Sequence, residues 1–188
     1  MTGPSFSRIF AFHDDLEEVL ALHQESLLLL ELALARELLG AYRRLLAVHM
    51  HHEEQQVLPV FQRLGRIDRW PVVLYTGQHA KMRGLLDRIE AQLGLAIAEP
   101  RANIRRVVIR LLDLETSYKH LAEHHDAAER QGLAPNADRA AEPDERAALL
   151  ETFCADWKSA LDREAPILAR AQLRLSPGGD DDRRAAAP

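Results

Sequence analysis

Apolar residues recur every three or four positions along almost the whole chain, and no stretch alternates apolar and polar residues as a half-buried strand does. This pattern predicts an all-α protein. The expected helices cover residues 6–25, 31–64, 68–95, 102–130 and 144–173. Four long helices with short connections favour an up-down-up-down four-helix bundle, with the fifth helix added at the C-terminus.

Glycine and proline set several expected boundaries. Gly65 is a natural C-terminal cap, and Asp68 can cap the helix that follows. Pro59 and Pro166 lie inside apolar stripes, which predicts a kink at the first and an interruption at the second. Residues 131–143, QGLAPNADRAAEP, are rich in turn formers and are predicted to form a loop.

The apolar stripes also suggest how the chain is divided. We expect a bundle over residues 1–136, a helical extension over 137–174 and a disordered tail over 175–188, where apolar residues are few. The extension has an apolar face that needs a partner surface, either the bundle or a second copy of the chain. That face contains Leu149, Leu150, Phe153, Trp157 and Leu161.

Composition narrows the class of protein. A chain of 188 residues can form one domain with a sizeable core. The net charge is −5 with both signs interspersed, so no nucleic-acid footprint is expected. We see neither a signal peptide nor an apolar run long enough for a bilayer, and the single Cys154 fits a reducing compartment. These features predict a cytoplasmic protein without membrane or nucleic-acid partners.

Histidine is unusually frequent, with nine residues, and two clusters belong to a repeated motif. Residues 49–59 read HMHHEEQQVLP, and residues 125–135 read HDAAERQGLAP. Both stretches follow the pattern His-x3-Glu-x5-Pro. Residues four apart share a helix face, so His49 projects with Glu53 and His125 projects with Glu129. Such polar groups are costly in an apolar core unless they are paired, which points to a shared metal site.

Distance from the connecting turns indicates which other histidines reach the same level. With a rise of about 1.5 Å per residue, His13 matches the depth of His49, whereas His23 lies too near the turn. His79 matches the depth of Glu53 by the same argument. On the fourth helix the repeat favours His125, although the bundle arithmetic slightly favours His120, and a shift of register would bring in His120 and His124.

Other polar neighbours have simpler expected roles. His51 is expected in solvent, and His52 is expected either at the surface or next to a metal ligand, with ligation itself as an alternative. Glu54 and Asp126 are expected in solvent, with a hydrogen bond to a ligating imidazole as the alternative.

The preferred ligand set is therefore four imidazoles and two carboxylates, namely His13, His49, Glu53, His79, His125 and Glu129. Two divalent ions would each take two histidine nitrogens, and each glutamate would bridge both ions with one oxygen apiece. An oxo or hydroxo bridge would bring each ion to about five ligands and leave a position for a small molecule.

This pattern resembles the hemerythrin-like, HHE cation-binding family over residues 6–136. The likeness lies in HMHHEEQQVLP, in HLAEHHDAAERQGLAP, and in the single histidines of FAFHDDLEEVL and YTGQHAKMRGLLDRIE. The resemblance implies a four-helix bundle that holds a non-haem centre of two iron ions, with manganese or zinc as other options. Members of the family bind oxygen, nitric oxide or peroxides, or serve in iron handling and iron-centre repair.

The sequence departs from the oxygen-carrying members at two points. Arg83 stands where they have a second histidine on the third helix, and His125-x3-Glu129 replaces their His-x4-Asp. It is more similar to the branch with two His-x3-Glu motifs, proposed to act in nitrosative stress or iron-sulfur repair, but lacks that branch's N-terminal cysteine-bearing segment.

Three hypotheses follow from these patterns. The first is a di-iron protein that binds or reduces a small diatomic or peroxide ligand. The second is sensing or storage by the same centre without turnover. The third is a mononuclear-metal or metal-free helical scaffold that acts through protein interactions, for example as a homodimer formed through the C-terminal helix.

Overall fold

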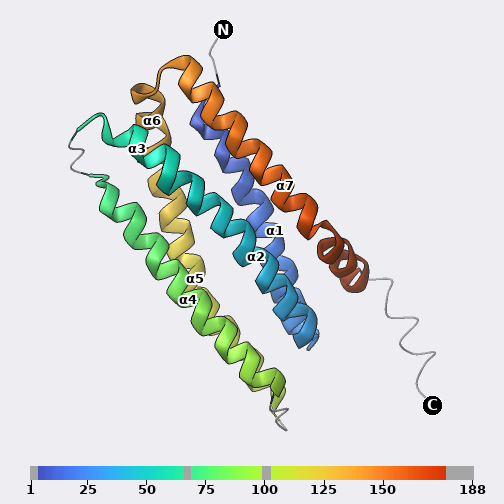
Figure 1. Ribbon diagram of the computed structural model, residues 1–188. Coiled ribbons are helices and arrows are strands. Elements are labelled where there is room, and N and C mark those ends of the chain that lie inside the picture. Colours follow the sequence, from blue (N-terminus) through green and yellow to red (C-terminus); the bar gives the residue numbers. More distant parts are fainter. Residues whose placement is uncertain (1–3, 66–68, 99–102, 177–188) are drawn as a thin grey trace.

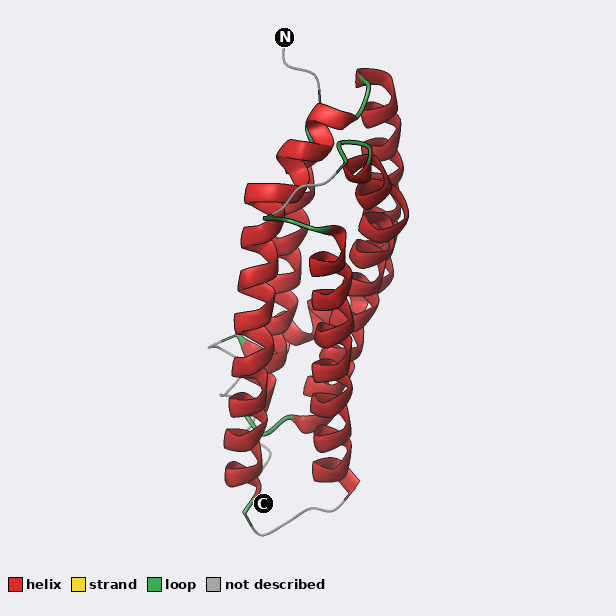
Figure 2. Cartoon of the chain, turned by 90° about the vertical axis from the view of Figure 1, so that its left-hand side faces the viewer, coloured by secondary structure: helices red, strands yellow, loops and turns green. Residues whose placement is uncertain are grey.

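The computed structural model describes residues 4–65, 69–98 and 103–176, and within these ranges the chain contains helices and loops but no strand (Figure 2). The all-α prediction is confirmed. The helical elements are η1 (Phe6–Phe10), α1 (Ala11–Leu28), α2 (Leu32–His52), η2 (Glu53–Val57), α3 (Leu58–Gln62), α4 (Val72–Ala98), α5 (Ile104–Ala128), η3 (Glu129–Leu133), α6 (Ala134–Ala140) and α7 (Pro143–Leu175).

The long helices lie side by side, and each runs opposite to the next along the chain (Figure 1). Helix α1 packs against α2, α4 packs against α5, and α2 also faces α4. Helices α1 and α5 are in contact over a much shorter length. The apolar residues of the second long helical stretch are buried in two clusters. The main core contains Tyr42, Leu45, Leu46, Val57, Val60 and Phe61, and Leu38 lies in a smaller cluster with Leu22, Leu34 and Ala171.

Helix α7 lies across α1 and α2 (Figure 1). Its Phe153 and Trp157 are buried, and Trp157 stacks on Phe12 with ring centroids 4.7 Å apart. The Trp157 indole N–H also donates to Asp15 Oδ2 at 2.8 Å. Farther along, the Arg44 guanidinium donates two hydrogen bonds to Glu164, at 2.7 and 2.8 Å. The apolar face of the C-terminal helix is thus buried within its own chain.

Two local predictions are wrong. Residues 131–143 were expected to form a loop, but η3 and α6 continue the helix to Ala140. Pro135 is tolerated because the π-helical turn before it is wider and relieves its clash with the preceding carbonyl group. Helix α7 also continues through Pro166 instead of ending there. The proline and Asp162, whose carbonyl loses its partner, are both exposed, so water can replace the lost bond.

Some expected features lie at the edge of what is described. The cap at Asp68 and the tail beyond residue 176 fall outside the described residues. Gly65 has a φ of 76°, in agreement with its predicted role as a helix cap. Among the described helices, none has the length and the apolar character that crossing a bilayer requires.

The turn between α1 and α2 contains a strained residue. Leu30 has a φ of 61°, a left-handed conformation that is costly for any residue with a Cβ atom. Its neighbours form the hydrogen bonds of a helix C-cap, from Glu31 N–H to the Ser26 carbonyl at 2.9 Å and from Leu30 N–H to the Leu27 carbonyl at 3.0 Å. Glycine is the residue normally found at such a position.

We expect Leu30→Gly to raise the free energy of unfolding by about 0.5–1 kcal/mol, because the relief of left-handed strain outweighs the extra chain entropy of glycine in the unfolded state. Leu29→Gly is the matched control, since Leu29 has a φ of −82° and is similarly exposed. It should lower the stability by a similar amount. Urea unfolding of both variants measures the change in the free energy of unfolding. A change of the same sign in both variants would refute strain at Leu30.

Candidate metal centre

The long helices bring six polar side chains together inside the protein. Helix α1 contributes one histidine, α4 contributes one, and the two His-x3-Glu motifs contribute a histidine and a glutamate each. The residues are His13, His49, Glu53, His79, His125 and Glu129. All are buried except His13, whose side chain is 12% exposed. These are the six residues that the sequence analysis selected.

The four histidines form two pairs whose Nε2 atoms face each other. His13 Nε2 lies 3.2 Å from His49 Nε2, and His79 Nε2 lies 3.0 Å from His125 Nε2. Two nitrogens bound to one ion at about 2.1 Å are separated by roughly 3.0–3.4 Å. The spacing of each pair therefore fits two ligands of one metal ion.

Three of the four histidines have an acceptor at Nδ1, provided by a neighbouring helix. The pairs are His13 with Asp126 at 2.5 Å, His79 with Glu54 at 2.8 Å, and His125 with Gln78 at 3.0 Å. Each acceptor holds a proton on Nδ1, which leaves Nε2 of the neutral ring with a bare lone pair. Two such lone pairs cannot bond to each other, so the pair His79 and His125 requires a cation between them, either a proton or a metal ion.

Both carboxylates extend from one histidine pair to the other. Glu53 places Oε1 at 3.4 Å from His49 Nε2 and Oε2 at 3.1 Å from His79 Nε2. Glu129 places Oε2 at 3.1 Å from His13 Nε2 and Oε1 at 2.5 Å from His125 Nε2. Each glutamate thus directs one oxygen to each pair, which is the arrangement of a bridging carboxylate.

The four carboxylate oxygens are buried and, apart from the histidine Nε2 atoms, have no hydrogen-bond partner among the described residues. Such groups are costly unless a cation compensates them. Two overlapping groups of ligand atoms within 4.8 Å of one another can hold an ion: Glu53, His79, His125 and Glu129 form one, and His13, His49 and Glu129 form the other. Imidazole and carboxylate are the donors that iron, manganese and zinc accept, so the residues fit two such ions.

The shifted pKa values indicate that protons compete with a metal ion for these histidine and glutamate side chains. Burial lowers the pKa of His49, but Glu53 and Glu129 outweigh it and raise that pKa to about 10. His125 is raised to a pKa of about 10 in the same way, chiefly by Glu129. Burial and Glu129 raise the pKa of Glu53, but the histidines outweigh them and lower it to about 2. The pKa of Glu129 is also well below its usual range. A metal ion must therefore displace bound protons.

The repeated proline has a structural explanation. Each motif glutamate begins a π-helical turn, in which Leu58 N–H donates to the Glu53 carbonyl and Ala134 N–H donates to the Glu129 carbonyl. Both turns end two residues before the motif proline. A proline cannot make the i to i−4 hydrogen bond and collides with that carbonyl, so a wider turn before it relieves the clash. The motif thus specifies a π-turn at each bridging position.

The second π-turn also depends on a glycine. A Cβ atom on Gly132 would lie 2.6 Å from both Trp70 Cγ and the Tyr75 hydroxyl oxygen, too close for any side chain. The Tyr75 hydroxyl donates to the Ala128 carbonyl at 3.2 Å, one residue before Glu129. The close approach of Tyr75 therefore supports the backbone that carries the glutamate.

The remaining histidines lie outside the centre. His51, His120 and His124 are exposed, so a shifted register on α5 is not observed. His52 is buried, so the alternative of a place at the surface is wrong. Its ring stacks on Phe153, with centroids 4.5 Å apart, and its Nε2 bonds to Asp156 at 2.9 Å.

The acceptors of the imidazole protons were only partly anticipated. Glu54 and Asp126 each hydrogen-bond the imidazole of a candidate ligand, His79 and His13, and both retain partial exposure. Gln78 was missed by sequence reasoning. Gln78 bonds to His125 on the neighbouring helix, so no spacing within one helix indicated this contact.

A second polar cluster, also missed, lies three turns away on α1. His23 is fully buried, its Nδ1 bonds to the Ala35 carbonyl at 2.7 Å, and its Nε2 bonds to Glu115 Oε1 at 2.9 Å. Gln24 donates to the other Glu115 oxygen at 2.9 Å. The signal was a glutamate inside an apolar stripe, four residues after Leu111.

We expect Glu115→Ala to lower the free energy of unfolding by about 3–5 kcal/mol, because it leaves the buried His23 without its partner. Metal content per folded chain should stay the same, since the cluster is separate from the centre. Calorimetric unfolding together with metal analysis tests both parts. Loss of metal from folded Glu115→Ala would show that the two clusters are coupled.

Comparison with protein-family models, with curated proteins and with solved structures finds no match to this chain.

Proposed function

We propose that the chain is a hemerythrin-like, non-haem di-iron protein that binds or senses a small oxidant, such as oxygen, nitric oxide or a peroxide. One observation supports this proposal above the others. Two buried carboxylates, with no other hydrogen-bond partner among the described residues, each direct one oxygen to each of two histidine pairs. Within the pairs the Nε2 atoms lie 3.0 and 3.2 Å apart. We further propose an up-down-up-down four-helix bundle made of α1, α2, α4 and α5, with α7 as an added helix, located in the cytoplasm.

Each of the six residues would have a distinct role in binding the two ions. His13 and His49 hold one ion, His79 and His125 hold the other, and Glu53 and Glu129 bridge them. Bound iron would supply the electrons and the open coordination positions that an oxidant needs. The acceptors at Nδ1 fix the imidazole orientation and raise the basicity of the ligands.

Helix α7 contributes by covering one side of the centre. Phe153 and Trp157 lie over the His49 ring, with centroids 5.8 and 6.4 Å away. This apolar cover excludes water on the α1–α2 side, so the ligand must approach from elsewhere. Exclusion of water strengthens the electrostatic interactions within the centre.

An anaerobic titration tests the proposal. Protein loaded with ferrous ions should change its near-ultraviolet absorption on addition of hydrogen peroxide, oxygen or nitric oxide, whereas zinc-loaded protein should not. A Glu53→Gln variant should respond much more weakly, because a neutral amide is a poor bridge between two cations. No difference between the ferrous and zinc forms would refute oxidant binding.

A further inference from the structure

A cavity of about 500 Å³ lies beside the proposed metal centre, at the seam where α1 and α5 are in contact only briefly. One end is lined by His13, His49 and His125, and it extends along the helices as far as Gln24. It is the side of the centre that α7 does not cover.

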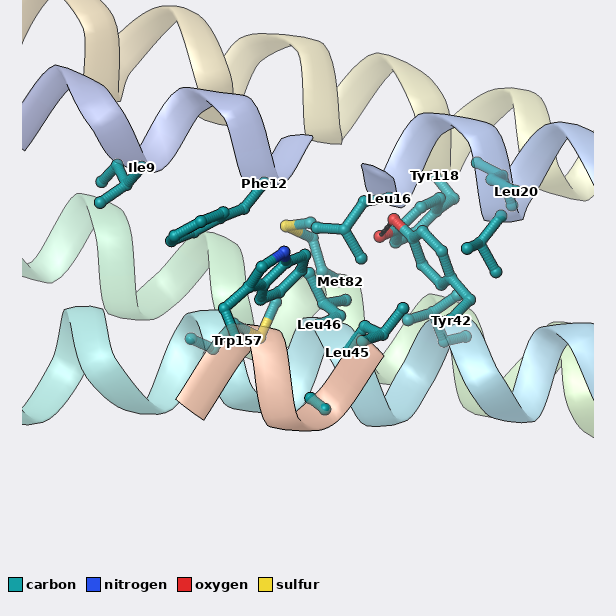
Figure 3. Packing of buried hydrophobic residues seen from close by; sticks show 14 of the residues in the cluster. Ile9, Phe12, Leu16, Leu20, Tyr42, Leu45, Leu46, Met82, Tyr118 and Trp157 are labelled. Carbon is teal, nitrogen blue, oxygen red and sulfur yellow. Dashed lines mark hydrogen bonds between the residues drawn. The ribbon is translucent and has the colours of Figure 1, made fainter. Parts of the chain in front are cut away.

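The walls between these ends are mainly apolar. They comprise Leu16, Leu20, Leu46, Met82 and Ala122, together with the ring of Tyr42. The Tyr42 hydroxyl bonds to the Tyr118 hydroxyl, so it has a partner within the protein (Figure 3). Figure 3 shows these two hydroxyls directed at each other among Leu16, Leu20 and Met82. This part of the cavity offers few groups that could bind a charged ligand.

The mouth of the cavity is negatively charged. It is lined by the exposed side chains of Glu17, Ala21, Lys119 and Glu123, which provide two carboxylates and one ammonium group. Asp126 also lines the cavity, but its carboxylate is paired with Arg130 and with His13, so the net charge of the mouth comes from Glu17, Glu123 and Lys119. An anionic ligand would meet net repulsion here, whereas an uncharged one would not.

The volume also argues for a ligand larger than a diatomic molecule. A water-sized molecule occupies about 30 Å³, roughly a fifteenth of the cavity. Pockets of about 300–1,000 Å³ with apolar walls and few polar groups typically hold organic ligands. The polar groups here are concentrated at the histidine end.

We propose that this cavity binds the alkyl chain of an uncharged organic hydroperoxide, with the oxygen end placed at His13, His49 and His125. The peroxide part rests on the proposed function, whereas the chain site does not depend on any metal. The cavity selects for a medium-length chain by its apolar walls and against fatty-acid anions by its acidic mouth.

The chain site is tested with 1-alkanols from butanol to octanol, titrated by calorimetry into the protein before and after treatment with a chelator. Affinity should rise about three- to fourfold per added methylene, and octanoate should bind about tenfold more weakly than octanol at neutral pH. An affinity that does not depend on chain length would overturn the site.

Two variants obstruct the cavity without replacing a proposed metal ligand, Ala122→Trp within its wall and Ala21→Trp at its mouth. Ala122→Trp and Ala21→Trp should each weaken octanol binding about tenfold or more while metal content stays unchanged. Ala91→Trp, on an exposed position of α4, is the control and should bind octanol normally. Unchanged octanol affinity in either filled variant, provided that it folds, would refute the assignment.

The hydroperoxide part has a separate readout. Two ferrous ions would give one electron each to the O–O bond of an alkyl hydroperoxide, and cleavage of that bond with uptake of two protons would yield an alcohol and water. This oxidation should be faster than that by hydrogen peroxide, and Ala122→Trp should remove the preference. Equal rates in the unaltered protein would overturn the hydroperoxide assignment. Octanol binding by a chain that takes up no metal would instead refute the di-iron function and leave the chain site standing.

Discussion

Replacing His49 and His125 together by alanine should abolish metal uptake. The double variant removes one nitrogen ligand from each ion position, since His49 faces His13 and His125 faces His79. Loss of a partner outside the ligand set typically weakens metal binding by about 10–100-fold, so loss of a ligand from both positions should exceed this range. Metal content after purification, measured with iron supplied during growth, gives the result.

His120→Ala with His124→Ala is the matched control. Both histidines lie on α5 close to His125 but are exposed, so metal content should not change. Equal metal content in the two double variants would refute the ligand assignment. Loss of metal only in the control would restore the shifted register on α5.

Raising the pH should destabilise the protein after its metal has been removed with a chelator. The pKa of His49 and of His125 is about 10 in the folded chain, against an ordinary 6.5. A group with a raised pKa contributes stability that is fully present below pH 6.5 and is lost as the pH rises towards 10. A shift of one pKa unit corresponds to about 1.4 kcal/mol. The raised pKa values of the two histidines should therefore change the free energy of unfolding strongly with pH.

The carboxylates make the stability of the chelated protein fall at low pH. Glu53 has its pKa lowered from 4.5 to about 2, so its contribution is present above pH 4.5 and is lost as the pH falls through 2. The chelated protein should therefore be most stable between about pH 4.5 and 6.5.

The metal-loaded protein should behave differently at high pH. Metal ions replace the bound protons, so raising the pH strengthens metal binding, and the difference in stability between loaded and chelated protein should widen from pH 6.5 to 10. Urea unfolding of both forms over this range measures the difference. A difference that does not change with pH would mean that these groups do not exchange protons for metal.

Periodicity was sufficient to predict an all-α chain, because apolar residues three and four positions apart form one face of a helix. It failed at residues 131–143. Gly and Pro favour turns in general, but here Pro135 is the second residue of α6 and Gly132 is needed for close packing against Trp70. Only the tertiary environment distinguishes these uses.

The six residues selected from the repeat and from depth along the helices are those that the structure brings together. That selection was possible because i to i+4 spacing and helix rise are nearly constant. The supporting groups were harder to predict. Gln78 bonds to His125 across a helix interface, and His23 pairs with Glu115, which is 92 residues away. Such contacts depend on helix rotation and packing, which spacing alone does not specify.

The most direct test of the central claim is the metal content per chain, measured on protein purified without added metal or chelator, together with the near-ultraviolet and visible spectrum of the same sample. We expect about two iron ions per chain and an absorption band that changes on reduction. A folded, colourless protein with one zinc ion or no metal at all would contradict it.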